Sequence, residues 1–277
     1  METVKELLPA CSAVLLDPQF GAAEAIYEGL LGQKGIIVAT EETGYIEEPD
    51  GRINQVVPGW SLEKAKRMGA SAAKLLVYYN PRLSKLAETQ MEFVRSLGEK
   101  AEDLDLPLLV EPMSYSAEKS MPKNSAEFAA IRLDIVLKTV IDLGKLGIDL
   151  LKLEFPVDVS FESDKKDWLA ACEKISAEAP IPWVLLSAGV DFEIFREQLI
   201  VACKAGAAGF VAGRAIWKEA TQVTGQERTD FFKRVASERA KQLVDIVHQF
   251  STNPWRKTFS EKIKPVEKNW LTHYKDF

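Results

Sequence analysis

Two lysines lie within stretches of sequence that otherwise have the composition of buried strands. Lys152 stands in the run LLKLEF at 150–155, and Lys74 stands among apolar residues at 72–78. Burying an ammonium group is costly unless the group is paired or loses its proton. A neutral lysine is a nucleophile, and burial or a second cation activates lysines that form Schiff bases. The two residues therefore indicate imine chemistry, with Lys74 as the cation that lowers the pKa of Lys152.

Two carboxylates accompany the lysines. Glu111 ends an apolar run directly before Pro112, and Glu154 follows Lys152 by two residues, which places both on one face of a strand. A carboxylate there would move the protons of carbinolamine formation and of C–C bond cleavage. The alternative is a buried Lys–Glu ion pair that only supports the fold, and such pairs are weak evidence for stability. Two lysines together with two carboxylates favour the functional interpretation.

The composition excludes several other chemistries. The chain of 277 residues holds two histidines, His248 and His273, too few for the usual zinc sites or histidine-activated nucleophiles. No Gly-rich nucleotide-binding motif follows a predicted strand, so we expect neither metal nor cofactor. The net charge of −6 argues against binding to nucleic acid or to a membrane surface. Three dispersed cysteines and the lack of a long apolar run indicate a cytoplasmic protein.

Seven short apolar runs alternate with amphipathic helical patterns. The strands are expected at 12–17, 35–40, 72–78, 106–111, 148–155, 182–188 and 208–213. The helices are expected at 21–32, 61–69, 83–103, 125–146, 164–178, 191–205 and 227–250. Such alternation, with nearly continuous apolar strands, predicts an α/β fold with a parallel sheet covered on both faces.

The polar residues decide between two arrangements of that sheet. They gather where the predicted strands end, at Asp17, Glu41, Tyr78, Glu111, Glu154, Ser187 and Arg214. A TIM-type (β/α)8 barrel brings all its strand ends to one mouth, so it is favoured over a doubly wound sheet. Only seven strands are found, and the first residues, METVKELLPA, resemble the tail of a helix. We therefore expect a barrel over 1–257 without its first strand and most of its first helix, then a C-terminal extension over 258–277.

Two successive turns near the end of the barrel suggest an anion site. The segments Ser187-Ala188-Gly189 and Gly213-Arg214 follow the last two predicted strands. Barrels often bind phosphate after these strands, through backbone N–H groups and a helix N-terminus. Arg214 adds a forked cation. The alternative is a pair of ordinary turns with a surface arginine.

Six motifs resemble the class I tagatose-1,6-bisphosphate aldolase family, which includes the sulfofructose-phosphate aldolases. They are LLDPQFG at 15–21, ETGY at 42–45, KLLVYY at 74–79, KLEFP at 152–156, LSAGV at 186–190 and GRAIW at 213–217. The motifs occur in the family's order and span roughly residues 1–257. The family's first strand ends in an Asp-Gln-Arg motif, which this chain does not match.

The resemblance implies a TIM barrel and a metal-independent aldolase that cleaves a phosphorylated ketose to dihydroxyacetone phosphate and an aldehyde. Lys152 matches the family's Schiff-base lysine, Glu111 its acid/base, and Lys74 its second active-site lysine. The residues that match its phosphate pocket are Ser187, Gly213 and Arg214. The sequence leaves open whether the ketose is a tagatose or fructose bisphosphate or a sulfofructose phosphate.

Two other functions remain open from the sequence. A non-catalytic sugar-phosphate sensor, or a degenerate pseudo-aldolase, is suggested by the absent first strand. A barrel enzyme such as a phosphosugar isomerase would use a carboxylate base without an imine. In each case the partner is a small sugar phosphate, and an open barrel edge would favour a homo-oligomer.

Overall fold

A single curled parallel sheet organises the chain. The computed structural model describes residues 1–48, 51–116, 118 and 120–252. The sheet has seven strands in the order β1-β2-β5-β6-β7-β8-β9, and every neighbouring pair is parallel. The strands are β1 (Ala13–Leu16), β2 (Gly35–Ala39), β5 (Ala72–Tyr78), β6 (Leu108–Met113), β7 (Leu150–Leu153), β8 (Trp183–Leu186) and β9 (Gly209–Val211). All seven strands expected from the sequence are present.

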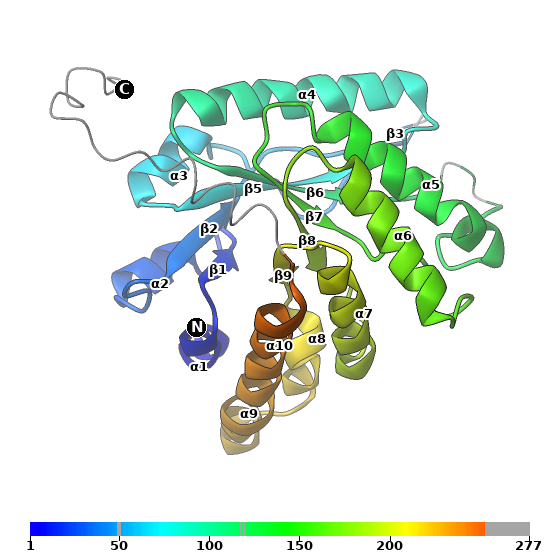
Figure 1. Cartoon of the computed structure of the whole chain (residues 1–277). Helices are drawn as coiled ribbons and strands as arrows, with labels where there is room; N and C mark the ends of the chain where they lie inside the picture. The colour runs from blue at the N-terminus through cyan, green and yellow to red at the C-terminus, as the bar shows by residue number, and fades with distance from the viewer. Residues whose placement is uncertain (49–50, 117, 119, 253–277) are drawn as a thin grey trace, which may run out of the picture.

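Helices follow the strands and cover the outside of the curled sheet (Figure 1). They are α2 (Ala22–Tyr27), α3 (Leu62–Met68), α4 (Ser84–Asp103), α5 (Ala126–Leu143), α6 (Lys165–Glu178), α7 (Phe192–Lys204) and α10 (Ser237–Phe250). Local sequence defines several of their starts: Ser61 and Ser125 accept N-capping hydrogen bonds from Lys64 N and Phe128 N. The predicted strand–helix alternation is confirmed.

The two faces of the sheet differ in character. On the outer face, buried side chains such as Leu75, Val110 and Leu151 pack with the helices in one apolar core. The alternate positions on the inner face include Lys74, Glu111 and Lys152. Because all strands are parallel, polar groups near their carboxyl ends meet at one mouth.

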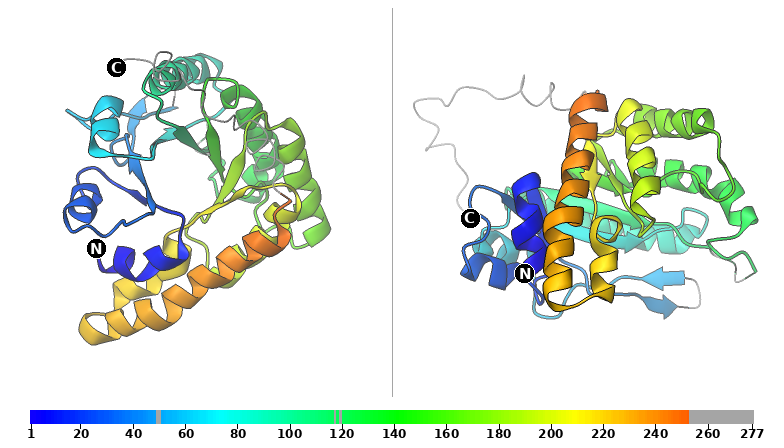
Figure 2. Two further views of the ribbon diagram at one scale, coloured as in Figure 1. Left: turned by 60° about the vertical axis from the view of Figure 1, so that its left-hand side comes forward. Right: turned by 90° about the horizontal axis from the view of Figure 1, so that it is seen from below.

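The sheet remains open between its first and last strands. Within the described residues, no strand pairs with the outer edge of β1 or of β9. Helix α1 (Glu2–Leu7) packs instead against α10 and the π-helical turn η3 (Phe232–Ala236), as Figure 2 shows. The Glu2 carboxylate accepts hydrogen bonds from Arg228 Nε at 2.9 Å and Thr229 Oγ1 at 2.5 Å. The curled parallel sheet of seven strands confirms the prediction of a TIM-type barrel short of one strand.

Short elements account for the differences from the prediction. The sequence patterns did not indicate the antiparallel hairpin of β3 (Ile46–Glu48) and β4 (Gly51–Ile53), because its strands are too short for a period to emerge and every residue of β3 is exposed. The helix expected at 227–250 is divided into α9 (Gly225–Phe231), η3 and α10. The remaining short helices are η1 (Leu8–Ala10), α8 (Arg214–Trp217) and η2 (Lys218–Gln222). The expected extension at 258–277 lies outside the described residues.

None of the helices in the described part of the chain combines the length and the apolar character that a membrane crossing requires.

Gly98 allows α4 to approach the turn that precedes β7. A Cβ added at this position would lie 2.6 Å from Leu146 O and 2.7 Å from Gly147 O, both of which are backbone atoms. We expect Gly98→Ala to lower the free energy of unfolding by about 1–3 kcal/mol, the usual cost of overpacking. Urea denaturation measures this, with Glu99→Ala on the exposed side of α4 as the control. Equal stability of the two variants would contradict the close approach.

Candidate active site

Lys152 and Glu111 meet across neighbouring strands. The register pairs Val110 of β6 with Leu151 of β7, which brings the next residues of both strands to the same level. Lys152 Nζ lies 2.8 Å from Glu111 Oε2. The side chains are 12% and 10% exposed, so the ion pair lies almost entirely away from water.

Lys74 of the neighbouring strand β5 reaches the same carboxylate from a position nearer the amino ends of the strands. Its strand position is level with Leu109, two residues before Glu111, and its Nζ extends upward to within 2.9 Å of Glu111 Oε2. The same Nζ forms an ion pair with Glu41 Oε1 just beyond β2. One oxygen of Glu111 is therefore shared by two ammonium groups, whereas among the described residues Glu41 forms an ion pair with Lys74 alone.

The pKa values of the two lysines are shifted in opposite directions. Burial is the largest influence on both. At Lys152 it outweighs the attraction of Glu111, and together with the charge of Lys74 it lowers the pKa. At Lys74 the carboxylates of Glu41 and Glu111 outweigh burial and raise the pKa. Burial favours the neutral form of Glu111, but Lys74 and Lys152 together hold its pKa below the usual value. The arrangement thus keeps Lys74 cationic and Glu111 ionised while it favours a neutral Lys152.

Sequence reasoning left Glu41 without a role, although it recognised Glu41 as a polar residue at a strand end. Glu41 is 8% exposed, and its Oε2 is buried with no hydrogen-bond partner among the described residues. Its partner Lys74 is 33 positions away, so no local spacing links the two residues. The pairing could have been predicted from strand order, because Glu41 and Glu111 follow or end the two strands that flank the strand of Lys74.

Glu154 lies close to Lys152 in sequence but belongs to a different network. Its carboxylate accepts hydrogen bonds from Ser114 N at 2.8 Å, Ser114 Oγ at 2.5 Å and Lys123 Nζ at 2.5 Å. Arg132 Nη2 of α5 lies 3.7 Å from the same group. Because β7 ends at Leu153, strand alternation no longer sets the direction of residue 154. Glu154 therefore ties the segment between β6 and α5 to the end of β7, rather than pairing with the lysines.

The residues expected to bind an anion lie in the segments that follow β8 and β9. Ser187 is buried, and the next two residues have positive φ, +48° at Ala188 and +76° at Gly189. A Cβ at Gly189 would lie 3.3 Å from Arg214 Cζ, so the turn and the guanidinium are in contact range. Gly213 directly precedes α8, which Arg214 opens. Arg214 is exposed, and no carboxylate in the described part of the chain pairs with it.

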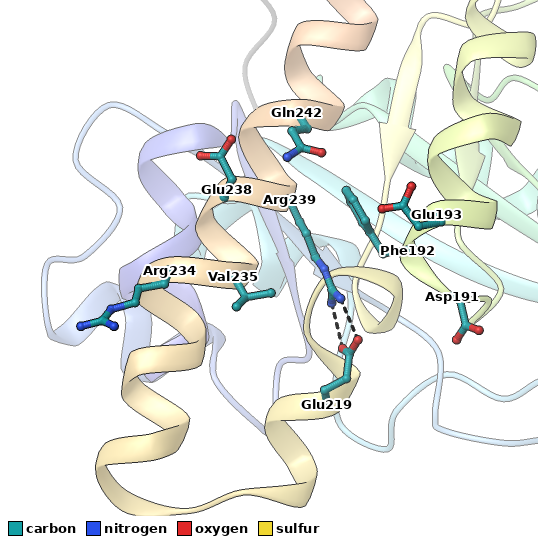
Figure 3. A pocket seen from close by; sticks show the side chains of 9 residues that line it. All are labelled: Asp191, Phe192, Glu193, Glu219, Arg234, Val235, Glu238, Arg239 and Gln242. Carbon is teal, nitrogen blue, oxygen red and sulfur yellow. Dashed lines mark hydrogen bonds and ion pairs between the residues drawn. The ribbon is translucent and has the colours of Figure 1, made fainter.

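A separate surface hollow lies between the start of α7 and the helices η2, η3 and α10 (Figure 3). Its central feature is Arg239, whose two terminal nitrogens donate to the two oxygens of Glu219 at 2.9 and 2.8 Å. None of the predicted site residues lines this hollow. Among the described residues, no group of three or more His, Cys, Asp or Glu side chains could hold a metal ion.

Comparison with known proteins identifies relatives across most of the chain. The family model described as "DeoC/LacD family aldolase" matches residues 2–219. Tagatose 1,6-diphosphate aldolase 2 of Streptococcus mutans is 29% identical over 273 residues, which cover 92% of this chain and 82% of the relative. Tagatose 1,6-diphosphate aldolase 1 of Enterococcus faecalis is 32% identical over 226 residues, covering 77% and 69%.

The fold is shared with solved aldolase structures. One is an archaeal fructose-1,6-bisphosphate aldolase whose catalytic lysine is covalently bound to the carbinolamine intermediate of the substrate. Its TM-score is 0.59 at 23% identity, and the match covers 89% of this chain and 81% of that one.

The buried charge of Glu154 gives a prediction about stability and pH. Burial opposes this charge, but Lys123 and Arg132 hold the pKa of Glu154 below the usual glutamate value. Its stabilising effect is therefore present above about pH 4.3 and is lost as the pH falls through the lowered folded pKa. We expect Glu154→Gln to cost about 3–5 kcal/mol at pH 7, the cost of breaking a buried pair.

The difference from wild type should shrink as the pH is lowered below about 4.3, because the variant has no carboxylate to protonate at this position. Chemical denaturation at a series of pH values measures this, with exposed Glu99→Gln as the control. A difference that stays constant down to acid pH would contradict an ionised Glu154.

Proposed function

The chain belongs to the DeoC/LacD aldolase family, and from this we propose that it cleaves a phosphorylated ketose through a Schiff base on Lys152, without a metal ion. The enzyme is therefore a lyase that breaks a carbon–carbon bond. The observation that carries the proposal is that Glu111 pairs with both the buried Lys74 and the largely buried Lys152, whose pKa values shift in opposite directions.

The first half of the proposed reaction uses Lys152 as the nucleophile. Its neutral amine attacks the C2 ketone, and a proton passes to the former carbonyl oxygen to give a carbinolamine. Protonation of the carbinolamine hydroxyl by a proton from solvent and loss of water then leave a protonated imine, which draws electrons from the neighbouring bonds. The lowered pKa of Lys152 supports this role, because only the unprotonated amine has a free electron pair.

The second half uses Glu111 as the base. Its carboxylate takes the proton of the C4 hydroxyl, the C3–C4 bond breaks, and the electron pair of that bond forms an enamine with the former imine. The aldehyde leaves. Protonation of the enamine at C3 and hydrolysis of the imine release dihydroxyacetone phosphate and free Lys152. The lowered pKa of Glu111 fits a base that is ionised at neutral pH.

Lys74 is proposed to act through its charge. It lies 2.9 Å from Glu111 Oε2 and remains cationic because Glu41 also pairs with it. A fixed cation next to Glu111 favours the neutral form of Lys152. The residues proposed to hold the phosphate at C1 are Ser187, Gly213 and Arg214, and the forked guanidinium of Arg214 matches two oxygens of this group.

The comparisons support this substrate class. The relatives from S. mutans and E. faecalis are named for tagatose 1,6-diphosphate, and the archaeal neighbour is named for fructose 1,6-bisphosphate. One observation favours a second candidate, a sugar-phosphate-binding protein without turnover: among the described residues, no strand pairs with the outer edge of β1 or of β9. A binding titration beside a cleavage assay distinguishes the two, because the second candidate binds the ketose without releasing dihydroxyacetone phosphate.

Replacement of the proposed nucleophile gives the direct test of function. We expect wild-type protein to release dihydroxyacetone phosphate from tagatose or fructose 1,6-bisphosphate, equally well with and without EDTA. Lys152→Met should abolish this cleavage while the variant keeps its circular dichroism spectrum. Lys145→Met, on an exposed turn, serves as the matched control and should retain full activity. An active Lys152→Met enzyme would refute the assignment.

The charge of Lys74 gives a prediction about the pH profile. Without this cation the pKa of Lys152 should rise, because Glu111 then pairs with Lys152 alone. In Lys74→Met, the acid limb of kcat/KM should therefore move to higher pH. Lys74→Arg keeps a cation at the position and should leave the limb closer to that of wild type. If the limb stayed in place in Lys74→Met, Lys74 would not control the protonation of Lys152.

A further inference from the structure

Among the described residues, no carboxylate forms an ion pair with Arg52 of β4, whose cross-strand neighbour in the hairpin is Glu47. Its guanidinium lies over three tyrosine rings, with Cζ 4.2 Å from the ring centroid of Tyr45, 5.0 Å from Tyr115 and 5.5 Å from Tyr78. Stacking on ring faces fixes the plane of a guanidinium but does not use its N–H donors. Within the described residues, no group accepts a hydrogen bond from this side chain, so its donors remain available to a ligand.

The backbone of Arg52 is fixed independently of its side chain. Arg52 N donates to Tyr115 Oη at 3.3 Å, and Gln90 Nε2 of α4 donates to Arg52 O at 2.9 Å. The preceding Gly51 has φ +141°, and a Cβ there would lie 2.4 Å from Tyr115 Oη, so only glycine allows the hairpin to come this close. The guanidinium is therefore held in place before any ligand binds.

The tyrosines connect Arg52 to the active site. Tyr78 shares the inner face of β5 with Lys74, four residues nearer the mouth, and Tyr115 follows Glu111 by four residues. Burial raises the pKa of Tyr78, and the charges of Arg52, Glu111 and Lys74 all act on it. Arg52 thus lies above the lysine–glutamate cluster, on the side of the mouth formed by β5 and β6.

The strand order sets Arg52 opposite Arg214. In the sheet order β1-β2-β5-β6-β7-β8-β9, Lys152 stands on β7, between the neighbours β5 and β6 on one side and β8 and β9 on the other. Arg214 and Ser187 follow β9 and β8 on one side, and the Arg52 cluster lies at β5 and β6 on the other. A ketose bound to Lys152 through C2 extends in two directions, with C1 and its phosphate on one side and the chain from C3 to C6 on the other.

We propose that Arg52 binds a terminal phosphate at C6 of the ketose, so that the enzyme prefers substrates with phosphate at both ends. The inference rests on the proposed function and adds a specificity-determining residue to it. A planar guanidinium with unused donors matches the oxygens of a phosphate dianion. In the direction of synthesis, the same group is the phosphate of glyceraldehyde 3-phosphate.

The test compares two aldehydes that differ only in this phosphate. Condensation of dihydroxyacetone phosphate with glyceraldehyde 3-phosphate is measured beside condensation with glyceraldehyde. In Arg52→Met, we expect kcat/KM for the phosphorylated aldehyde to fall about 10- to 100-fold, mainly through KM, as a charged hydrogen-bonding group is lost. The value for glyceraldehyde should fall by much less, so the ratio of the two constants decreases.

Two further variants complete the design. Arg52→Lys keeps the charge but not the planar fork, and it should lower the same ratio by a smaller factor. Arg95→Met removes an equal charge from an exposed position on α4 and should leave both rates unchanged.

The outcomes separate this inference from the proposed function. A wild-type enzyme that condenses neither aldehyde overturns the proposed function and the inference with it. A wild-type enzyme that condenses both, with Arg52→Met and Arg52→Lys each losing the same factor for the two aldehydes, leaves the function standing. In that case Arg52 only holds the hairpin, and the inference is wrong.

Discussion

The charges of the candidate active site are organised around one oxygen atom, Glu111 Oε2, which lies within 2.9 Å of two ammonium groups that are largely shielded from water. A single carboxylate cannot neutralise both charges in a site of low polarity. Glu41 removes the symmetry of this arrangement, because it pairs with Lys74 and not with Lys152. The cost of burial therefore falls mainly on Lys152, whose pKa is lowered, while Lys74 keeps its proton. The asymmetry favours the neutral form of Lys152 rather than of Lys74, and the neutral amine is the form that acts as a nucleophile.

The fold supplies this arrangement through strand register. Lys74 stands two residues lower than Glu111, and its long side chain spans that distance. Because the strands are parallel, the groups beyond their ends gather at the same mouth, with the turn of Ser187 and Arg214 on one side of Lys152 and the Arg52 hairpin on the other. The lysine–glutamate cluster lies on β5, β6 and β7, none of which is an edge strand of the described sheet.

The sequence predicted the parts that rest on repeated patterns. The seven strands and most helices followed from runs of apolar residues, and Lys74, Glu111 and Lys152 were distinguished as charged residues in those runs. What it did not predict depends on contacts between distant segments. Glu41 meets Lys74 only because β2 lies beside β5, and the hairpin of Arg52 is too short to show a period. Glu154 was expected on the same strand face as Lys152. The strand ends at Leu153, directly before Glu154, and the Glu154 carboxylate pairs with Lys123 instead.

The central claim is that Lys152, and not Lys74, becomes covalently attached to the substrate. The most direct measurement is reduction with borohydride in the presence of dihydroxyacetone phosphate, followed by proteolysis and mass spectrometry of the peptides. The account predicts a stable adduct on the peptide that contains Lys152 and unmodified Lys74. An adduct on Lys74 would reverse the roles of the two lysines, and no adduct on folded protein would contradict Schiff-base chemistry altogether.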